Sequence, residues 1–160
     1  MRRSIRLALA AAALALALPL ATVQAAPARA VHIDVETSLL DPSGLSGGPF
    51  TATGPAVDAG LICPSGDTID VFAKAAGYQS GKGWVNLTVV KEFTCGDGSG
   101  AFLVKLQVRL DKHGDHYAWA IVAGTGAYGH LQGAGTGYGA APLGDYDVLD
   151  VHEGMVADPA

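Results

Sequence analysis

The stretch that decides the fold runs from His116 to Tyr138 and reads HYAWAIVAGTGAYGHLQGAGTGY. Its first part, His116–Ala123, places large apolar residues at every second position, which is typical of a β-strand with one buried face. The glycines that follow end this strand, because glycine adopts the positive φ angles that a tight turn needs. A second strand of small residues, Leu131–Tyr138, comes next. The stretch therefore predicts two strands joined by a glycine-rich turn.

Glycine recurs on one face of the second of these strands, at Gly133, Gly135 and Gly137. Glycine weakens a strand, because it packs against nothing and loses more entropy than other residues on folding. A large neighbour can fill the space, the strand can bend there, or a ligand can approach closely. The pattern favours packing, with Trp119 as the neighbour. A phosphate-binding loop is disfavoured, because a strand rather than a helix follows the glycines.

Six further segments are short, alternating or rich in β-branched residues, and we predict them as strands. They are Val31–Thr37, Phe50–Thr53, Thr68–Ala73, Trp84–Thr94, Ala101–Leu110 and Asp145–Val156. No helical period persists beyond the first residues of the chain. Eight short strands with glycine-rich connections indicate an antiparallel sandwich or a closed barrel. Closure is favoured, because it removes the exposed sheet edges of a protein that works outside the cell.

The N-terminus has the features of a secretory signal peptide. Arg2, Arg3 and Arg6 precede an apolar run that is too short to span a bilayer comfortably. Small residues suited to cleavage occur at Ala25 and Ala26. We therefore predict a signal peptide over residues 1–26, a single domain over residues 27–160, and an extracellular location.

The charge of the chain excludes some partners. The formal net charge of −5 becomes −8 once the three arginines of the leader are removed. No basic cluster is present, so we expect no nucleic-acid partner and no adsorption to an anionic membrane. No cofactor motif appears, so we expect no cofactor. The outer strand faces look charged, which favours a monomer, although the sequence leaves the oligomeric state open.

The two cysteines, Cys63 and Cys95, predict one disulfide, because exported proteins oxidise cysteine pairs. Two buried free thiols are the alternative. Zinc is disfavoured, because neither cysteine has a second ligand at the usual spacing. His113, Asp115 and His116 come closest to a metal cluster, but no further strong ligand is near them in sequence, so we expect a polar turn and no metal site.

Several polar residues lie in the predicted strands and are candidates for chemistry. In the last strand, Asp145, Asp147 and Glu153 share one face, whereas Asp150 and His152 share the other. The remaining candidates are His32, Asp34, Asp70 and His116. We expect most of these side chains to face water, since exposed charged groups are the norm. No serine lies in a nucleophile elbow. The catalytic residues, if the protein has any, are therefore not assigned.

The motifs of the central stretch resemble those of the allene oxide cyclase/dirigent-like β-barrel superfamily, and in particular those of small exported actinobacterial proteins. The resemblance rests on Trp119-x-Ile121 and on the turn residues Gly124, Gly126, Tyr128, Gly133 and Gly135. Three further pieces also carry it, namely Phe50–Ala56, Leu61–Gly66 and Phe93–Gly100. It implies an eight-stranded antiparallel barrel. Plant members of the superfamily cyclise an epoxide or steer radical coupling, and some microbial members cyclise polyketides, but their acidic catalytic positions match no particular residue here.

Three functions follow from these observations. The leading hypothesis is a secreted barrel that binds a small apolar ligand in its interior, since small eight-stranded barrels either fill with side chains or hold one ligand. The second is a cyclase or isomerase that uses one buried acid. The third is a filled, purely structural barrel. An interior cavity would separate the first two from the third, and a carboxylate or tyrosine facing that cavity would favour the second.

Overall fold

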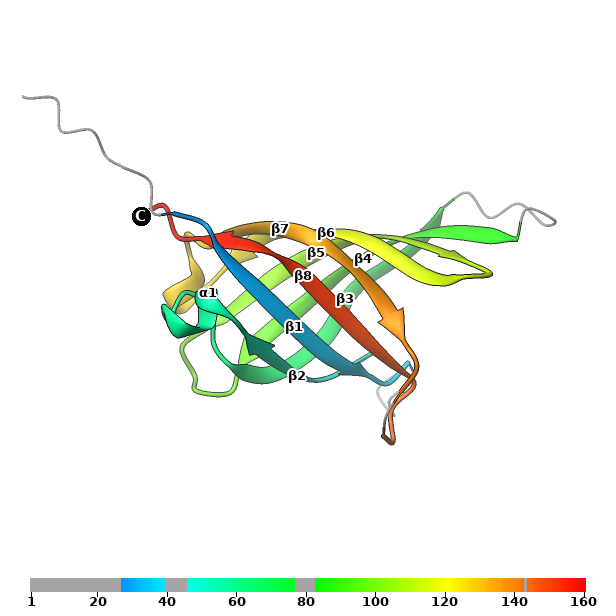
Figure 1. Cartoon of the computed structure of the whole chain (residues 1–160), viewed down its shortest axis with the longest axis horizontal. Helices are drawn as coiled ribbons and strands as arrows, with labels where there is room; N and C mark the ends of the chain where they lie inside the picture. The colour runs from blue at the N-terminus through cyan, green and yellow to red at the C-terminus, as the bar shows by residue number, and fades with distance from the viewer. Residues whose placement is uncertain (1–26, 40–45, 77–82, 143) are drawn as a thin grey trace, which may run out of the picture.

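The computed structural model describes residues 27–39, 46–76, 83–142 and 144–160, and these form one closed barrel of eight antiparallel strands in sequential order (Figure 1). The strands are β1 (Arg29–Thr37), β2 (Gly47–Thr53), β3 (Ser65–Ala76), β4 (Trp84–Cys95), β5 (Ala101–Asp111), β6 (Gly114–Gly124), β7 (Gln132–Ala140) and β8 (Val148–Ala157). Pairing of β1 with β8 closes the ring. The predicted fold class is confirmed. The predicted leader, residues 1–26, lies outside the described residues.

The structure corrects some of the predicted boundaries. Two one-turn helices, α1 (Pro55–Asp58) and η1 (Gly126–Tyr128), lie in predicted loops. Strand β3 already begins at Ser65, ahead of the predicted start at Thr68, because Ser65 pairs with Thr51 of β2. Strand β8 begins only at Val148, so Asp145 and Asp147 precede the strand that was predicted to contain them.

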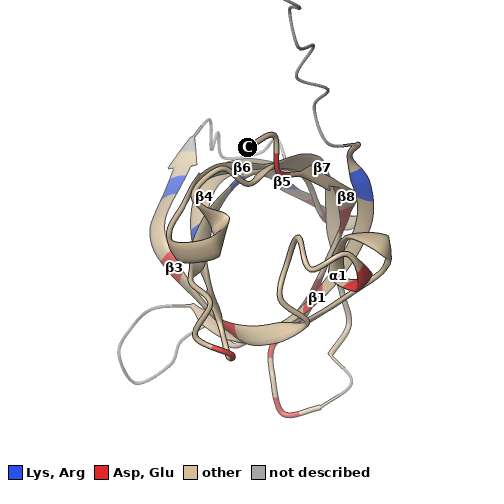
Figure 2. Ribbon diagram, turned by 90° about the vertical axis from the view of Figure 1, so that its left-hand side faces the viewer, with Lys and Arg blue, Asp and Glu red and all other residues tan. Residues whose placement is uncertain are grey.

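The two ends of the barrel differ. At the end that we call the disulfide end, α1 and η1 lie beside the last residues of β2, β4 and β6, and Figure 2 views the barrel from this side. At the opposite end, which we call the pocket end, β1 finishes at Thr37 and β8 begins at Val148. Within the described residues, no helix is long and apolar enough to cross a membrane.

Aromatic rings fill the disulfide end. Phe93 lies at the centre, with its ring 5.1 Å from that of Phe50 and 5.0 Å from that of Phe102. The ring of Tyr128 packs edge-on against Phe102 at 5.6 Å. These four residues are at most 4% exposed. Each large buried aromatic side chain removes apolar area from water, so these four rings form a packed core in this half of the barrel.

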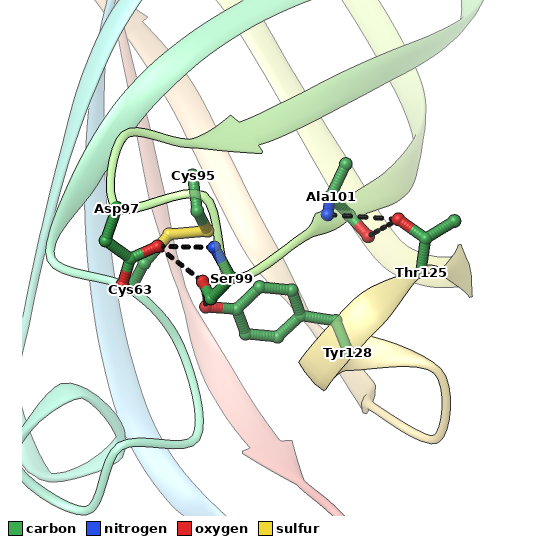
Figure 3. Close-up of a disulfide and its surroundings, with 7 residues drawn as sticks. All are labelled: Cys63, Cys95, Asp97, Ser99, Ala101, Thr125 and Tyr128. Carbon is green, nitrogen blue, oxygen red and sulfur yellow. Dashed lines mark hydrogen bonds between the residues drawn. A yellow bond between two sulfur atoms is a disulfide. The ribbon is translucent and has the colours of Figure 1, made fainter.

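A disulfide and a hydrogen-bonded turn close this end (Figure 3). Cys63, in the segment before β3, is bonded to Cys95, the last residue of β4, so the predicted disulfide is present. The hydroxyl groups of Ser99 and Tyr128 are 2.7 Å apart. Gly126 has φ of +59°, and a side chain there would overlap the carbonyl of Ser99. The turn glycine is therefore needed to bring η1 against the β4–β5 hairpin.

The glycine face of β7 is crowded by both of its neighbouring strands, β6 and β8. Gly135 pairs with Trp119, whose indole Nε1 donates to the carbonyl of Thr136 over 3.1 Å. At Gly137, the ring of Tyr117 occupies the place that a side chain would take. The predicted packing explanation is therefore supported, but Trp119 is not the neighbour at these glycines: it lies against Gly154 of β8, whereas the backbone of Glu153 and Gly154 takes the space at Gly135.

Candidate functional site

The interior of the barrel holds a cavity of about 210 Å³ at the pocket end. Its apolar lining comes from Leu39, Ala73, Leu87, Val89, Leu106, Val108 and Val148, and its polar lining from Thr37, Ser46, Asp70, Lys91, Asp115, Tyr117 and Asp150. Pockets for drug-sized ligands measure about 300–1,000 Å³, so this pocket suits a more compact molecule. Larger hollows on the outer face over β6–β8 are more open to solvent.

A lysine inside the barrel is the centre of the polar lining. Lys91 of β4 continues the inward face that Leu87 and Val89 begin, and it is 2% exposed. Its Nζ lies 2.8 Å from Oδ1 of Asp70 and 3.9 Å from Oδ2 of Asp150. The Asp70 contact is close enough for an ion pair, but its angles are not those of a hydrogen bond. A buried ammonium group needs such counter-charges, because desolvation strongly disfavours an unpaired ion.

A β-bulge places Asp70 inside the barrel. Asp70 pairs with Lys91, but the next pair is Phe72 with Val90, so Val71 has no partner in the ladder. Both Val71 and Phe72 are about half exposed on the outside. A bulge inserts one residue and re-aims the side chains around it. The expectation that Asp70 faces water is therefore wrong, since its carboxylate lies against Lys91 in the pocket.

Asp150 of β8 is the most deeply placed carboxylate of the pocket. The Thr37 hydroxyl donates to its Oδ2 over 2.7 Å. Burial raises the pKa of the Asp150 carboxyl; the Lys91 ammonium and the Thr37 hydrogen bond act in the opposite direction, and repulsion from Asp115 and Asp70 adds to the increase. A carboxyl group with a raised pKa can hold a proton in a site where an ordinary one has lost it.

Tyr117 and His152 form a hydrogen-bonded pair beneath the pocket. The Tyr117 hydroxyl donates to the carbonyl of Val151 over 3.0 Å and lies 3.2 Å from Nδ1 of His152. Because a tyrosine has a single hydroxyl hydrogen, this arrangement places the imidazole hydrogen on Nδ1. Nε2 of His152 is then an acceptor, and it has no hydrogen-bond partner within the described part of the chain.

Burial sets the charge states of this pair. It lowers the pKa of His152 to about 3, and the nearby Lys91 charge adds to that effect. It also raises the pKa of Tyr117, as do the charges of Asp150 and Asp115. His152 packs between aromatic rings, 5.0 Å from that of Tyr117 and 5.9 Å from that of Phe93. It is therefore a neutral histidine at the boundary between the aromatic core and the pocket.

The structure sorts the polar candidates of the last strand by face. Asp150 and His152 are buried inside the barrel, which corrects the expectation that such side chains face water. Glu153 lies outside, 3.6 Å from His32. Asp147 accepts a hydrogen bond from the backbone of Leu39 at 2.7 Å, ahead of the strand.

The remaining candidates lie mostly outside. His32 and Asp34 contact each other on the outer face of β1 at 3.1 Å. Asp115 lines the pocket, whereas the adjacent His116 is exposed. Among the described residues, no group of three or more histidine, cysteine or acidic side chains is placed to hold a metal ion.

Sequence reasoning missed Lys91 and Thr37. A signal for Lys91 was present, since it follows Leu87 and Val89 at the same period of two. Reading a lysine as exposed is the usual choice, because lysine is almost never buried without a partner. Here the partners come from β3 and β8, which are remote in the sequence.

The class that these observations define is a closed eight-stranded β-barrel with one disulfide and a polar interior pocket at one end. Comparisons of the chain with protein-family models, with curated proteins and with solved structures found no match.

Proposed function

We propose that this protein is an exported barrel that binds a compact, mainly apolar small molecule in its pocket. The cavity of about 210 Å³ supports this proposal, because it has apolar walls and a few polar groups at one end of an otherwise packed barrel. Ligand sites typically combine an apolar lining with a small number of placed polar groups. The resemblance to the allene oxide cyclase/dirigent-like superfamily and the signal-like leader also support a secreted small-molecule barrel.

Native mass spectrometry of protein recovered from the culture medium tests this proposal. We expect a co-purified small molecule. We also expect the mass of the polypeptide to be that of a chain that begins after Ala25 or Ala26. Val108→Phe should reduce ligand occupancy, since Val108 lines the pocket. Val90→Phe is the matched control on the outer face of β4, opposite Lys105. Equal occupancy in both variants, with both folded, would contradict binding inside the barrel.

An acid-catalysed cyclase or isomerase is the second candidate function. The specific observation in its favour is Asp150, a buried carboxyl with a raised pKa that faces the cavity. Such a group can donate a proton to a bound substrate and take it back. Isomerisation conserves mass, so incubation of the recovered ligand with fresh protein should change its retention time without changing its mass. Asp150→Asn should lose this conversion while still binding.

A further inference from the structure

We propose that the pocket selects a ligand with one positive charge, namely a compact organic amine with an apolar body. This inference rests on the proposed binding function and names the class of its ligand. The cavity defines the site, and the charges that line it decide which ligand it accepts.

Carboxylates outnumber cations in the pocket. Among the residues that the structure describes, Asp70, Asp115 and Asp150 line it, and Lys91 is the single cationic residue in the lining. Lys91 is already paired with Asp70 at 2.8 Å. If Asp150 holds its proton, the charges of Lys91 and Asp70 cancel, and Asp115 supplies one uncompensated negative charge. If Asp150 ionises, the excess of negative charge is larger. In both states the pocket favours a cation over an anion.

Asp115 is placed to meet that cation. Within the described ranges, no basic side chain forms an ion pair with it. Its carboxylate lies against β7 at Gly139, in the place that any larger residue would fill. It is half-buried, so it contacts the pocket without the full loss of hydration that a deep carboxylate suffers. A charge-assisted hydrogen bond to a ligand ammonium group would satisfy it.

An anionic ligand meets two obstacles. Its carboxylate would have to compete with Asp70 for Lys91, which is 98% buried by its own surroundings. It would also lie near Asp115 and Asp150, and like charges repel strongly where water is largely excluded. A neutral ligand meets no repulsion, but it leaves Asp115 without a counter-charge. The apolar side chains Leu87, Val89, Leu106 and Val108 can hold the body of any of these ligands.

Three probes of similar shape and different charge separate these possibilities: benzylamine, benzyl alcohol and benzoate. We expect benzylamine at pH 7 to bind about tenfold more tightly than benzyl alcohol, as measured by calorimetry and by NMR shifts, and benzoate to bind more weakly than either. Asp115→Asn should bring the amine-to-alcohol ratio close to one. Asp34→Asn, on the outer face, is the matched control and should leave the ratio unchanged.

The outcomes distinguish this inference from the proposed function. If benzyl alcohol or benzoate binds as tightly as benzylamine, and Val108→Phe weakens all three, the pocket binds ligands but does not select a cation. If Asp115→Asn folds with an unchanged melting temperature and keeps the amine preference, Asp115 is not the group responsible. If none of the probes binds, both the selectivity and the pocket as a site for compact ligands are wrong.

Discussion

His152 is a neutral imidazole in a setting that opposes its protonation. Its folded-state pKa of about 3 lies below the unfolded value of 6.5, so the unfolded chain takes up the proton first. Stability from this group is present above about pH 6.5 and is lost as the pH falls toward 3, at up to about 1.4 kcal/mol per pH unit. His152→Leu should reduce the slope of the free energy of unfolding against pH by the contribution of one proton, as measured by urea unfolding between pH 4 and 8.

Other groups titrate in the same range, so the comparison of variants isolates His152. His130→Leu is a suitable control, because His130 is exposed. The variant at position 130 should keep the slope of the parent protein. An identical slope in parent and His152→Leu would mean that His152 can become protonated in the folded barrel.

Lys91 is held by partners on two other strands, and removal of its charge leaves them unpaired. Lys91→Met should lower the free energy of unfolding at pH 7 by about 3–5 kcal/mol, because Asp70 and Asp150 would lose their buried counter-charge. Adding Asp70→Asn should recover part of this loss. Lys105→Met, on the exposed face of β5, should change stability little. If Lys91→Met is as stable as Lys105→Met, the buried network does not stabilise the fold.

At the scale of the element, β7 is shaped by close contacts with both of its neighbours, β6 and β8. Gly137→Ala would push against the Tyr117 ring and the carbonyl of Val151, neither of which can move freely. Gly133→Ala would meet Cγ1 of Val156 at 2.7 Å and Cδ1 of Ile121 at 3.0 Å, which are the ends of side chains, and the carbonyl oxygen of Met155 no closer than 3.0 Å. Overpacking a well-filled site costs about 1–3 kcal/mol.

We therefore expect Gly137→Ala to lower the urea midpoint more than Gly133→Ala. It should also weaken ligand binding, because displacement of Tyr117 alters the wall of the pocket. A larger loss of stability in Gly133→Ala would show that Gly137 is not needed to make room for the Tyr117 ring.

The strands could be predicted from the sequence because alternation reports one buried face, whatever the neighbours are. Phe102, Val104, Leu106 and Val108 of β5 are buried as that pattern predicts, whereas Leu110, which the same pattern places inside, is 43% exposed near the end of the strand. Strand β8 is different, because apolar and polar residues occur on both of its faces. Its orientation is set by simultaneous pairing with β1 and β7, in which His152 lies opposite Ile33 and Gly137. This orientation of β8 places Asp150 and His152 inside the barrel, and no local sequence pattern predicts it.

For the whole molecule, one end of the barrel interior is a packed core that stabilises the fold, and the other end holds the candidate site. The aromatic cluster of Phe50, Phe93, Phe102 and Tyr128 fills the disulfide end, which leaves the other end free to hold charged groups and a cavity. Ring closure makes this possible, since every strand has two hydrogen-bonded neighbours and no edge needs protection. The pocket could not be predicted from the sequence because its polar groups come from β1, β3, β4, β6, β8 and the residue before β2, which only closure brings together.

The disulfide should add stability without defining the fold. It joins Cys63 to Cys95 across 32 residues, and such a loop constrains the unfolded chain by about 3–4 kcal/mol. The ladder of hydrogen-bonded strands stays intact without it, so Cys63→Ala/Cys95→Ala should melt at a lower temperature with an unchanged β-sheet circular dichroism spectrum. Benzylamine binding, where present, should persist, because the pocket lies at the opposite end of the barrel. Loss of the β spectrum at a temperature where the parent is folded would make the bond essential to the fold. A mass with two free thiols in the purified protein would show that the bridge does not form.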